Sequence, residues 1–173
     1  MSIDGDRESV RHMKSIINTN SIENITVVNK AVSKNAGNFV IFGPNKIMKE
    51  SGVLNTSTSA IKTEICNQQD YKIETTTLGD LVEECKKHSN EIFIKIDIEG
   101  GEGNILKDIS EYCKKFPVLL SFHVDWWLTT PEESHKRLSE FIENTKFNDM
   151  NLDHVSLTKH VIEHPFCSVL FTP

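Results

Sequence analysis

The chain has 173 residues, of which 38% are hydrophobic and 25% are charged, and these proportions exclude a disordered or fibrous protein. Its 19 basic and 25 acidic residues leave a formal charge of −6, which argues against general binding to nucleic acids or anionic membranes. A chain of this length buries a core without disulfides or metal ions but has no room for two large domains. We therefore expect residues 1–173 to form a single domain.

The cysteines and the hydrophobic segments give a consistent picture of the protein's compartment. No Cys-x-x-Cys pair occurs, so we expect reduced and mostly buried thiols at all four cysteines, which are Cys66, Cys85, Cys113 and Cys167. The N-terminus has no basic segment followed by an apolar one, and no apolar stretch reaches the roughly 18 residues of a membrane span. We expect a soluble, cytoplasmic protein without a membrane partner.

The first third of the chain predicts one helix and two strands. Hydrophobic residues at three-to-four-residue spacing predict a helix over residues 7–18, and a β-branched run predicts a strand over 25–29. A turn at 35–37 leads into a second strand at 38–42. Residues 43–60 are rich in Gly, Ser and Thr without periodicity, and they predict a long surface loop.

Strands and helices alternate through the middle of the chain. Residues 71–76 alternate as a half-exposed strand does, and a helix over 78–85 follows them. Residues 91–97 are apolar and β-branched, which predicts a strand covered on both faces, with a helix beginning near Ile105. Residues 117–123 repeat the signal of a buried strand.

The last part of the chain has one clear helix start. Thr130, Pro131 and Glu133 match a capping residue, a first-turn proline and a capping-box glutamate, so a helix should run from there through Ile142. Two further strands are predicted around 154–157 and 167–171.

Alternating strands and helices predict an α/β fold with right-handed crossovers. We expect a mainly parallel sheet with helices on both faces and a C-terminal antiparallel edge. Ligands bind such sheets at the carboxyl ends of the strands. The polar residues that follow Ile3, Asn29, Ile96 and Phe122 are therefore the candidates for a functional site.

The densest polar segment, residues 95–103, contains the three carboxylates Asp97, Glu99 and Glu102. Carboxylates are costly to crowd unless they face solvent, a cation or a ligand. One interpretation is a solvated turn with Glu102 near a helix N-terminus. Another is a magnesium site, which requires the chain to turn after Asp97 because alternate residues of a strand point to opposite faces.

The glycines of this segment invite comparison with a dinucleotide-binding loop. Gly101 and Gly103 follow a predicted strand, but Leu106 occupies the position of the third glycine. Glu102 would also bring negative charge to a pyrophosphate. We therefore reject a dinucleotide fingerprint.

Several segments together resemble the FkbM-type methyltransferase family. They are Thr75-Thr76-Thr77-Leu78-Gly79-Asp80-Leu81, the strand-borne Ile94-Lys95-Ile96-Asp97-Ile98-Glu99-Gly100-Gly101-Glu102, and Pro117-Val118-Leu119-Leu120. Upstream, residues 2–9 resemble the family's second strand and the turn after it, and residues 28–37 resemble the segment after its third strand. The resemblance covers nearly the whole chain.

The resemblance implies a Rossmann-like class I methyltransferase fold with S-adenosylmethionine as methyl donor. It implies O-methylation, with a small molecule or a sugar as the acceptor. By position, Asp4 would accept hydrogen bonds from the donor's ribose hydroxyls, as a carboxylate at a strand end can do. Lys30 and Ala31 would lie near the adenine and contact it mostly through backbone groups, and Asp97 would face donor and acceptor.

Catalytic roles follow for three residues. Asp97 is the first candidate at the reacting atoms, Glu99 would position the acceptor, and His123 is a candidate base because its intrinsic pKa suits proton transfer near neutral pH. Trp126 and Trp127 form either a wall for the acceptor or a packed part of the core.

The resemblance begins at the family's second strand. We therefore expect an N-terminally truncated form of the fold, without the first strand and the glycine-rich loop that hold the donor's methionine part. A strand edge exposed in this way favours self-association. Two alternatives stay open: a catalytically inactive fragment that serves as a binding or assembly module, and a magnesium-dependent hydrolase built on Asp97, Glu99 and Glu102.

Overall fold

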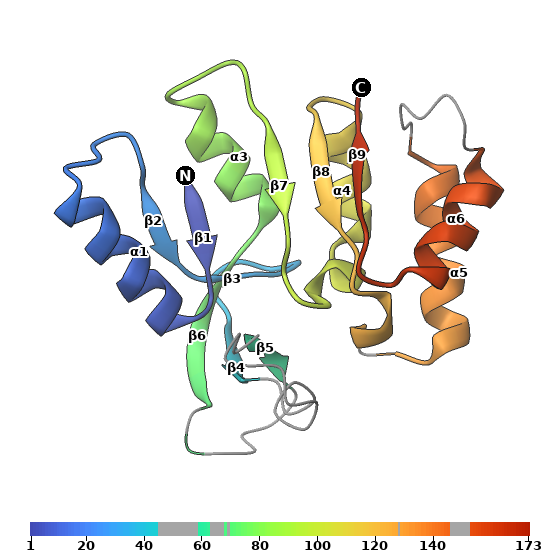
Figure 1. Ribbon diagram of the computed structural model, residues 1–173, viewed down its shortest axis with the longest axis horizontal. Helices are drawn as coiled ribbons and strands as arrows, with labels where there is room; N and C mark the ends of the chain where they lie inside the picture. Colours follow the sequence, from blue (N-terminus) through green and yellow to red (C-terminus); the bar gives the residue numbers. More distant parts are fainter. Residues whose placement is uncertain (45–58, 63–67, 69, 128, 146–152) are drawn as a thin grey trace. The chain divides into compact units, whose positions relative to one another are not determined.

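A computed structural model describes residues 1–44, 59–62, 68, 70–127, 129–145 and 153–173 (Figure 1). These residues belong to two compact units, Met1–Thr77 and Leu78–Pro173, and each unit is described by itself. None of the helices within the described ranges combines the length and hydrophobicity needed to cross a lipid bilayer. The expectation of a single domain stays a prediction.

In its described residues the first unit has two small sheets and one helix. In chain order its elements are β1 (Ser2–Asp4), α1 (Arg7–Thr19), β2 (Val27–Asn29), β3 (Ala31–Val32), β4 (Phe39–Pro44), β5 (Ser59–Lys62) and β6 (Tyr71–Thr76). β1 and β2 pair in parallel, and the other sheet has the order β3-β6-β4-β5. Asp4 lies opposite Asn29, so β1 and β2 end at the same level.

Local polar contacts and one small core hold this unit together. The Asp6 side chain caps α1 by accepting hydrogen bonds from the backbone N–H groups of Glu8 and Ser9. Ala31, Phe42 and Ile73 form a buried cluster. A Cβ atom at Gly5 would lie only 2.5 Å from the Phe42 ring, so the close approach of the chain to this ring requires glycine there.

The second unit is built on a three-stranded sheet. Its elements are α3 (Leu78–Lys86), β7 (Ile94–Ile96), η1 (Gly101–Asn104), α4 (Leu106–Cys113), β8 (Val118–Ser121), η2 (Val124–Trp126), α5 (Pro131–Glu143), α6 (His154–Glu163) and β9 (Ser168–Phe171). β8 is the middle strand, parallel to β7 and antiparallel to β9. Helices α5 and α6 pack side by side (Figure 1).

Aromatic packing joins β8, α5 and β9. The Phe122 ring makes edge contacts with Phe141 and Phe171, with centroids 6.1 and 6.3 Å apart. The backbone N–H of Phe122 donates to the carbonyl oxygen of Cys167 at 2.8 Å. His123 follows directly and its ring lies 5.9 Å from the Phe166 ring. The end of β8 is therefore held by the C-terminal segment.

Several predictions from the sequence are confirmed. The helix at 7–18, the turn before β4, the strand at 71–76, the cap at Thr130 and the strand at 167–171 are all present. β9 supplies the antiparallel edge next to the parallel pair of β7 and β8. The α/β class is confirmed, although the sheets are small and mixed, since β4 is antiparallel to both β5 and β6.

The strand predicted at 154–157 is wrong, because these residues begin α6. The Asp153 side chain accepts a hydrogen bond from the backbone N–H of Ser156 and caps the helix. Leu157 and Val161, four residues apart, are the buried positions of this helix, and Val155 is exposed. The four residues chosen for the strand were too few to reveal this helical spacing.

The loop predicted at 43–60 is wrong at both ends. Gly43 and Pro44 belong to β4, Ser59 and Ala60 belong to β5, and residues 45–58 lie outside the described residues. A Cβ atom at Gly43 would clash with the Asp70 side chain. The glycine that indicated a loop is therefore required by close packing within a sheet.

The strand predicted within residues 91–97 is present, but it is shorter than predicted and only one of its faces is buried. Only Ile94–Ile96 forms β7, and Lys95 between the two buried isoleucines is exposed, as is Phe93 before the strand. Ile92 and Phe93 made the segment look uniformly apolar. The strand itself alternates, with Ile94 and Ile96 on the buried face and Lys95 on the exposed face.

The described cysteines are free thiols, with Cys113 buried and Cys85 and Cys167 half-buried. Burial raises the pKa of Cys113 to about 12, so this thiol stays protonated at neutral pH. Cys66 lies outside the described residues.

The N-cap of α5 provides a test of this fold. The Thr130 hydroxyl accepts a hydrogen bond from the backbone N–H of Glu133 at 3.3 Å. We expect Thr130→Ala to lower the free energy of unfolding by about 1 kcal/mol, because this N–H loses its acceptor. Thr130→Ser keeps the hydroxyl and serves as the control in urea unfolding. Equal stability of both variants would contradict the capping role.

Candidate functional site

The polar segment after β7 forms a tight turn. The backbone of Glu99 is left-handed, with a φ angle of 53°, and that of Gly100 has a φ angle of 89°. The Gly101 N–H then donates to the Ile98 carbonyl oxygen at 3.0 Å. The chain therefore turns directly after Asp97, as a shared site for Asp97 and Glu99 requires.

This turn brings Asp97 and Glu99 to His123, which follows β8. The His123 Nε2 atom lies 3.8 Å from Asp97 Oδ1 and 3.8 Å from Glu99 Oε2. One ligand atom from each residue lies within 4.8 Å of the other two. We call Asp97, Glu99 and His123 the acid–histidine cluster. All three residues were predicted from the sequence as catalytic, and the fold brings them together at the carboxyl ends of two parallel strands.

Glu102 supports the cluster from inside the protein. Its side chain is completely buried, and Oε1 lies 2.8 Å from His123 Nδ1 while accepting a hydrogen bond from the Ile98 N–H. In the tautomer protonated at Nδ1, His123 donates this hydrogen bond to Oε1 and its Nε2 atom is the acceptor. The interpretation of Glu102 as part of a solvated turn is wrong. Its role is to orient the imidazole so that Nε2 faces Asp97 and Glu99.

The environment raises the pKa of His123. Burial acts to lower this pKa, but the hydrogen bond and charge of Glu102, together with the charges of Glu99 and Asp97, outweigh it. Lys95 Nζ lies 3.1 Å from Asp97 Oδ2 and has a side chain more than half exposed. Such an exposed ion pair offsets little of the cluster's negative charge.

The tryptophans after β8 do not both fit the predicted acceptor wall. Trp127 is buried, and a Cβ atom at Gly103 would lie 2.7 Å from its indole ring. Gly103 is therefore required by packing against Trp127, and this residue belongs to the core. The side chain of Trp126 lies outside the described residues.

The predicted donor-binding residues lie in the first unit. Asp4 ends β1, and its Oδ1 accepts a hydrogen bond from the Asp6 N–H at 2.7 Å. Burial raises the pKa of Asp4 against the lowering effect of this hydrogen bond. Lys30 Nζ pairs with Glu74 Oε1 at 2.9 Å. The Ala31 side chain lies in the core, which leaves only its backbone for a ligand.

Sequence reasoning missed the residues that fix the loop after Asp4. The Tyr71 hydroxyl donates to the Gly5 carbonyl oxygen and accepts from the Arg7 N–H, and the Arg7 guanidinium lies 4.1 Å from the centre of the Tyr71 ring. The Asn29 amide donates to the carbonyl oxygens of Asp4 and Gly5. Asn29, at the end of β2, was the only local sign of these contacts. Tyr71 lies 66 residues from Gly5 in the sequence, so no local pattern indicated its contact with this loop.

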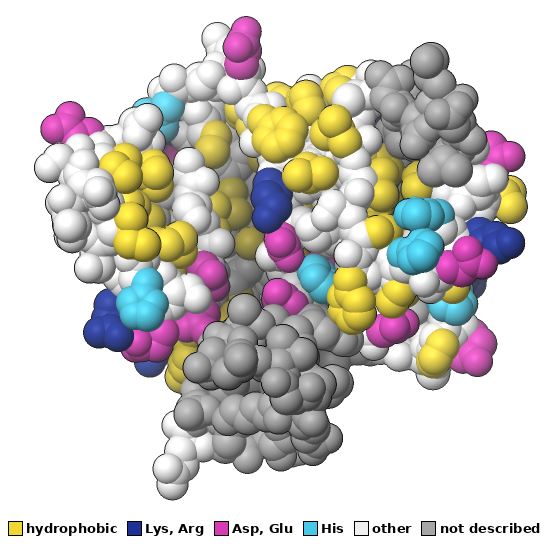
Figure 2. All heavy atoms as spheres, in the orientation of Figure 1, with side chains coloured by type: hydrophobic (Ala, Val, Ile, Leu, Met, Phe, Trp, Pro, Cys, Tyr) yellow, Lys and Arg dark blue, Asp and Glu magenta, His cyan; other side chains and the backbone are white. Residues whose placement is uncertain are grey.

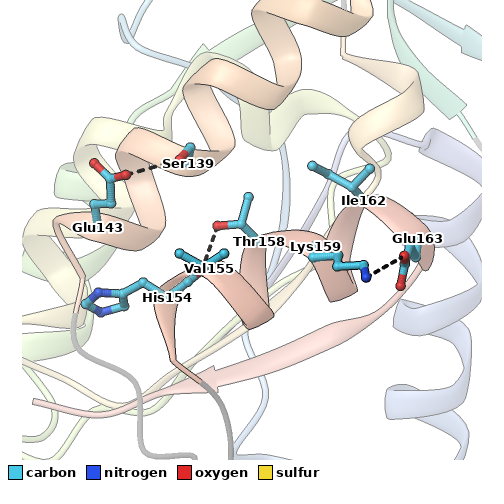
Figure 3. Close-up of a pocket in the computed structure, with 8 residues that line it drawn as sticks. All are labelled: Ser139, Glu143, His154, Val155, Thr158, Lys159, Ile162 and Glu163. Carbon is cyan, nitrogen blue, oxygen red and sulfur yellow. Dashed lines mark hydrogen bonds and ion pairs between the residues drawn. The ribbon is translucent and has the colours of Figure 1, made fainter.

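A separate hollow lies on the surface of α5 and α6 (Figure 3). Its polar side chains bond within their own helices, as Ser139 does with Glu143 and Lys159 with Glu163. The residues that line it are Ser139, Glu143, His154, Val155, Thr158, Lys159, Ile162 and Glu163. No buried polar group converges on this hollow among the described residues, so the acid–histidine cluster is the better candidate for chemistry.

Charges of both signs are mixed on one face of the protein. On the face shown in Figure 2, the Lys and Arg side chains of the described residues are interspersed with Asp and Glu side chains. A nucleic-acid backbone is usually bound by a continuous basic patch. The visible face offers no such patch among these residues.

The link between Glu102 and His123 can be tested by titration. We expect Glu102→Gln to lower the pKa of His123 more than Glu99→Gln does, because Glu102 raises this pKa through both a hydrogen bond and its charge, and these effects are larger than that of the Glu99 charge. NMR of the imidazole ring measures both values. Equal decreases would contradict the assignment.

The same pKa predicts how stability depends on pH. Because the pKa of His123 is raised above its usual 6.5, its stabilising contribution is complete below that pH and is lost as the pH rises through the raised value. Urea unfolding across this range should show the loss in the wild type and a smaller one in Glu102→Gln.

The comparisons with known proteins identify a family. The family model described as "Methyltransferase FkbM domain" matches residues 14–149, a range that contains the acid–histidine cluster, Lys30 and Ala31 but not Asp4. No curated protein and no solved structure matches the chain. Since the match covers most of the sequence, the chain belongs to the FkbM methyltransferase family.

Proposed function

We propose that the protein is an S-adenosylmethionine-dependent methyltransferase that methylates a hydroxyl oxygen of a small molecule or a sugar. The observation that carries the proposal is the convergence of Asp97, Glu99 and His123 at the ends of β7 and β8 in a chain of this family. Parallel strands place ligand-binding groups at this edge. A hydroxyl is the natural acceptor for a site composed of hydrogen-bond acceptors.

The reaction has simple requirements. The acceptor oxygen attacks the donor's methyl carbon in line with the sulfur, a carbon–oxygen bond forms, and the carbon–sulfur bond breaks to release S-adenosylhomocysteine. The hydroxyl proton must leave, through the cluster to water. Asp97 and Glu99 are partly exposed, so their oxygens can accept the hydroxyl's hydrogen bond and orient it for attack.

The donor's adenosine is assigned to the end of β1. The Asp4 carboxylate would accept hydrogen bonds from two neighbouring ribose hydroxyls, and Asn29 and Tyr71 hold the backbone that carries it. The backbone groups of Lys30 and Ala31 would lie against the adenine. These assignments extend the resemblance found in the sequence and are part of the proposal.

The first experiment is a calorimetric titration with S-adenosylhomocysteine. We expect saturable binding that Asp4→Ala weakens by about ten- to a hundredfold, the loss that follows removal of a hydrogen bond to a charged group. Glu8→Gln is the matched control, because Glu8 lies on α1 of the same unit and pairs only with Arg11 in its surroundings. Failure of the folded wild type to bind would contradict donor dependence and favour the inactive binding module.

Transfer itself is measured with labelled S-adenosylmethionine and a panel of sugars and small alcohols. We expect Asp97→Asn to reduce the turnover of any accepted substrate by at least about tenfold, because the amide no longer provides a charged acceptor for the hydroxyl. Glu111→Gln, an exposed position on α4, should leave turnover unchanged. Equal turnover of Asp97→Asn and the wild type would remove Asp97 from the reaction.

A further inference from the structure

The acid–histidine cluster combines two carboxylates with an imidazole around one point. Three atoms no more than 4.8 Å apart share a point within about 2.8 Å of each, close to the roughly 2.0–2.6 Å of metal–oxygen and metal–nitrogen bonds. A side-chain adjustment of a few tenths of an ångström would complete the coordination. The atoms come from the turn after β7 and the end of β8, so the backbone already sets their arrangement.

The surroundings of His123 have the form that metal-binding histidines require. Such a histidine nearly always donates its second ring N–H to a carboxylate or carbonyl, which fixes the tautomer and directs the other nitrogen at the metal. Here Nδ1 is bound to Glu102 Oε1 at 2.8 Å, and Nε2 faces Asp97 and Glu99. Glu102 therefore orients a ligand from behind and is not itself a ligand.

The charges give an independent argument. Glu102 is completely buried, and its Oε2 atom is also buried and has no hydrogen-bond partner among the residues that the structure describes. Asp97 and Glu99 add two negative charges beside it, and the ion pair of Asp97 with Lys95 lies in solvent. Buried or crowded carboxylates need a compensating cation. A divalent ion at the cluster supplies this charge.

We propose that Asp97, Glu99 and His123 bind one divalent transition-metal cation of the Mn²⁺ or Zn²⁺ type. An imidazole ligand favours such ions over Mg²⁺ and Ca²⁺, which prefer oxygen alone. The side chains of Asp97 and Glu99 are 39% and 27% exposed, so a cation there stays open to a further ligand from solvent. Three protein ligands with an open position is the form of a catalytic rather than a structural site.

The role of the cation, though not its binding site, rests on the proposed function. A bound divalent ion lowers the pKa of a hydroxyl that coordinates it, and the proton is released to water before the methyl group is transferred. The Nε2 lone pair of His123 then binds the cation. His123 therefore does not act as the general base that the sequence predicts. Asp97, Glu99 and His123 then orient the acceptor mainly by holding the ion to which its hydroxyl is bound.

Binding of Mn²⁺ alone, without donor or acceptor, tests the site. We expect the electron paramagnetic resonance signal of free Mn²⁺ to decrease on addition of the metal-stripped protein, with one ion bound per chain. Asp97→Asn and Glu99→Gln should each weaken binding by at least about tenfold, and Glu102→Gln by about ten- to a hundredfold through loss of the orienting hydrogen bond. Glu111→Gln, an equivalent change at an exposed position of the same unit, should bind as the wild type does.

Competition with Zn²⁺, Mg²⁺ and Ca²⁺ completes the experiment. Zn²⁺ should displace Mn²⁺, and equal concentrations of Mg²⁺ or Ca²⁺ should not. Absence of saturable binding of Mn²⁺ and Zn²⁺, or unchanged affinity in both Asp97→Asn and Glu99→Gln, would overturn the inference. Far-ultraviolet circular dichroism of each variant confirms that the fold is intact before binding is compared.

The donor titration separates the two proposals. If the metal-stripped protein binds S-adenosylhomocysteine but no Mn²⁺ or Zn²⁺, the cation site is wrong and the proposed function stands. If the cation binds with the expected dependence on Asp97 and Glu99 while no donor binds, the site stands and the proposed methyl transfer is wrong.

Discussion

The hydrogen bond between the buried side chains of Glu102 and His123 determines the local structure around the site. A carboxylate that is removed from water loses several kcal/mol unless donors replace its hydration. His123 and the Ile98 N–H are those donors, so the turn after β7 must pack against the end of β8. The left-handed backbone of Glu99 lies between the two residues of this turn that Glu102 connects, Ile98 and Glu102 itself.

The sequence predicts a structural feature well when neighbouring residues determine it, and poorly when residues far apart in the sequence do. The cap of α5 and the alternation of β6 are local, and both were predicted correctly. The polar segment after β7 was also recognised, together with its need for a turn. The burial of Glu102 was not predicted, because it depends on His123, which is 21 residues away in the sequence. Residues 154–157 show the opposite error, since the alternation of Val155 and Leu157 with polar residues was read as a strand, although these residues begin α6.

Glycines and aromatic residues were the least reliable functional signals. Gly103 resembled part of a nucleotide-binding loop, and Trp127 resembled a substrate wall, yet the two are packed against each other. Gly43 indicated a loop but lies in a strand against Asp70. Close packing and ligand binding both require a position without a side chain, so the residue type alone does not distinguish them. The surrounding burial does.

The C-terminal segment helps to position His123. Phe122 immediately precedes His123, and it is fixed by the Phe171 ring and by the carbonyl oxygen of Cys167. The C-terminal segment thus fixes the position of the imidazole through Phe122, the residue that directly follows β8. A sequence change in the last few residues, none of which belongs to the acid–histidine cluster, would therefore act as a remote adjustment of the cluster's geometry. Substitutions near the C-terminus would thereby change the geometry of the acid–histidine cluster while its three residues stay the same.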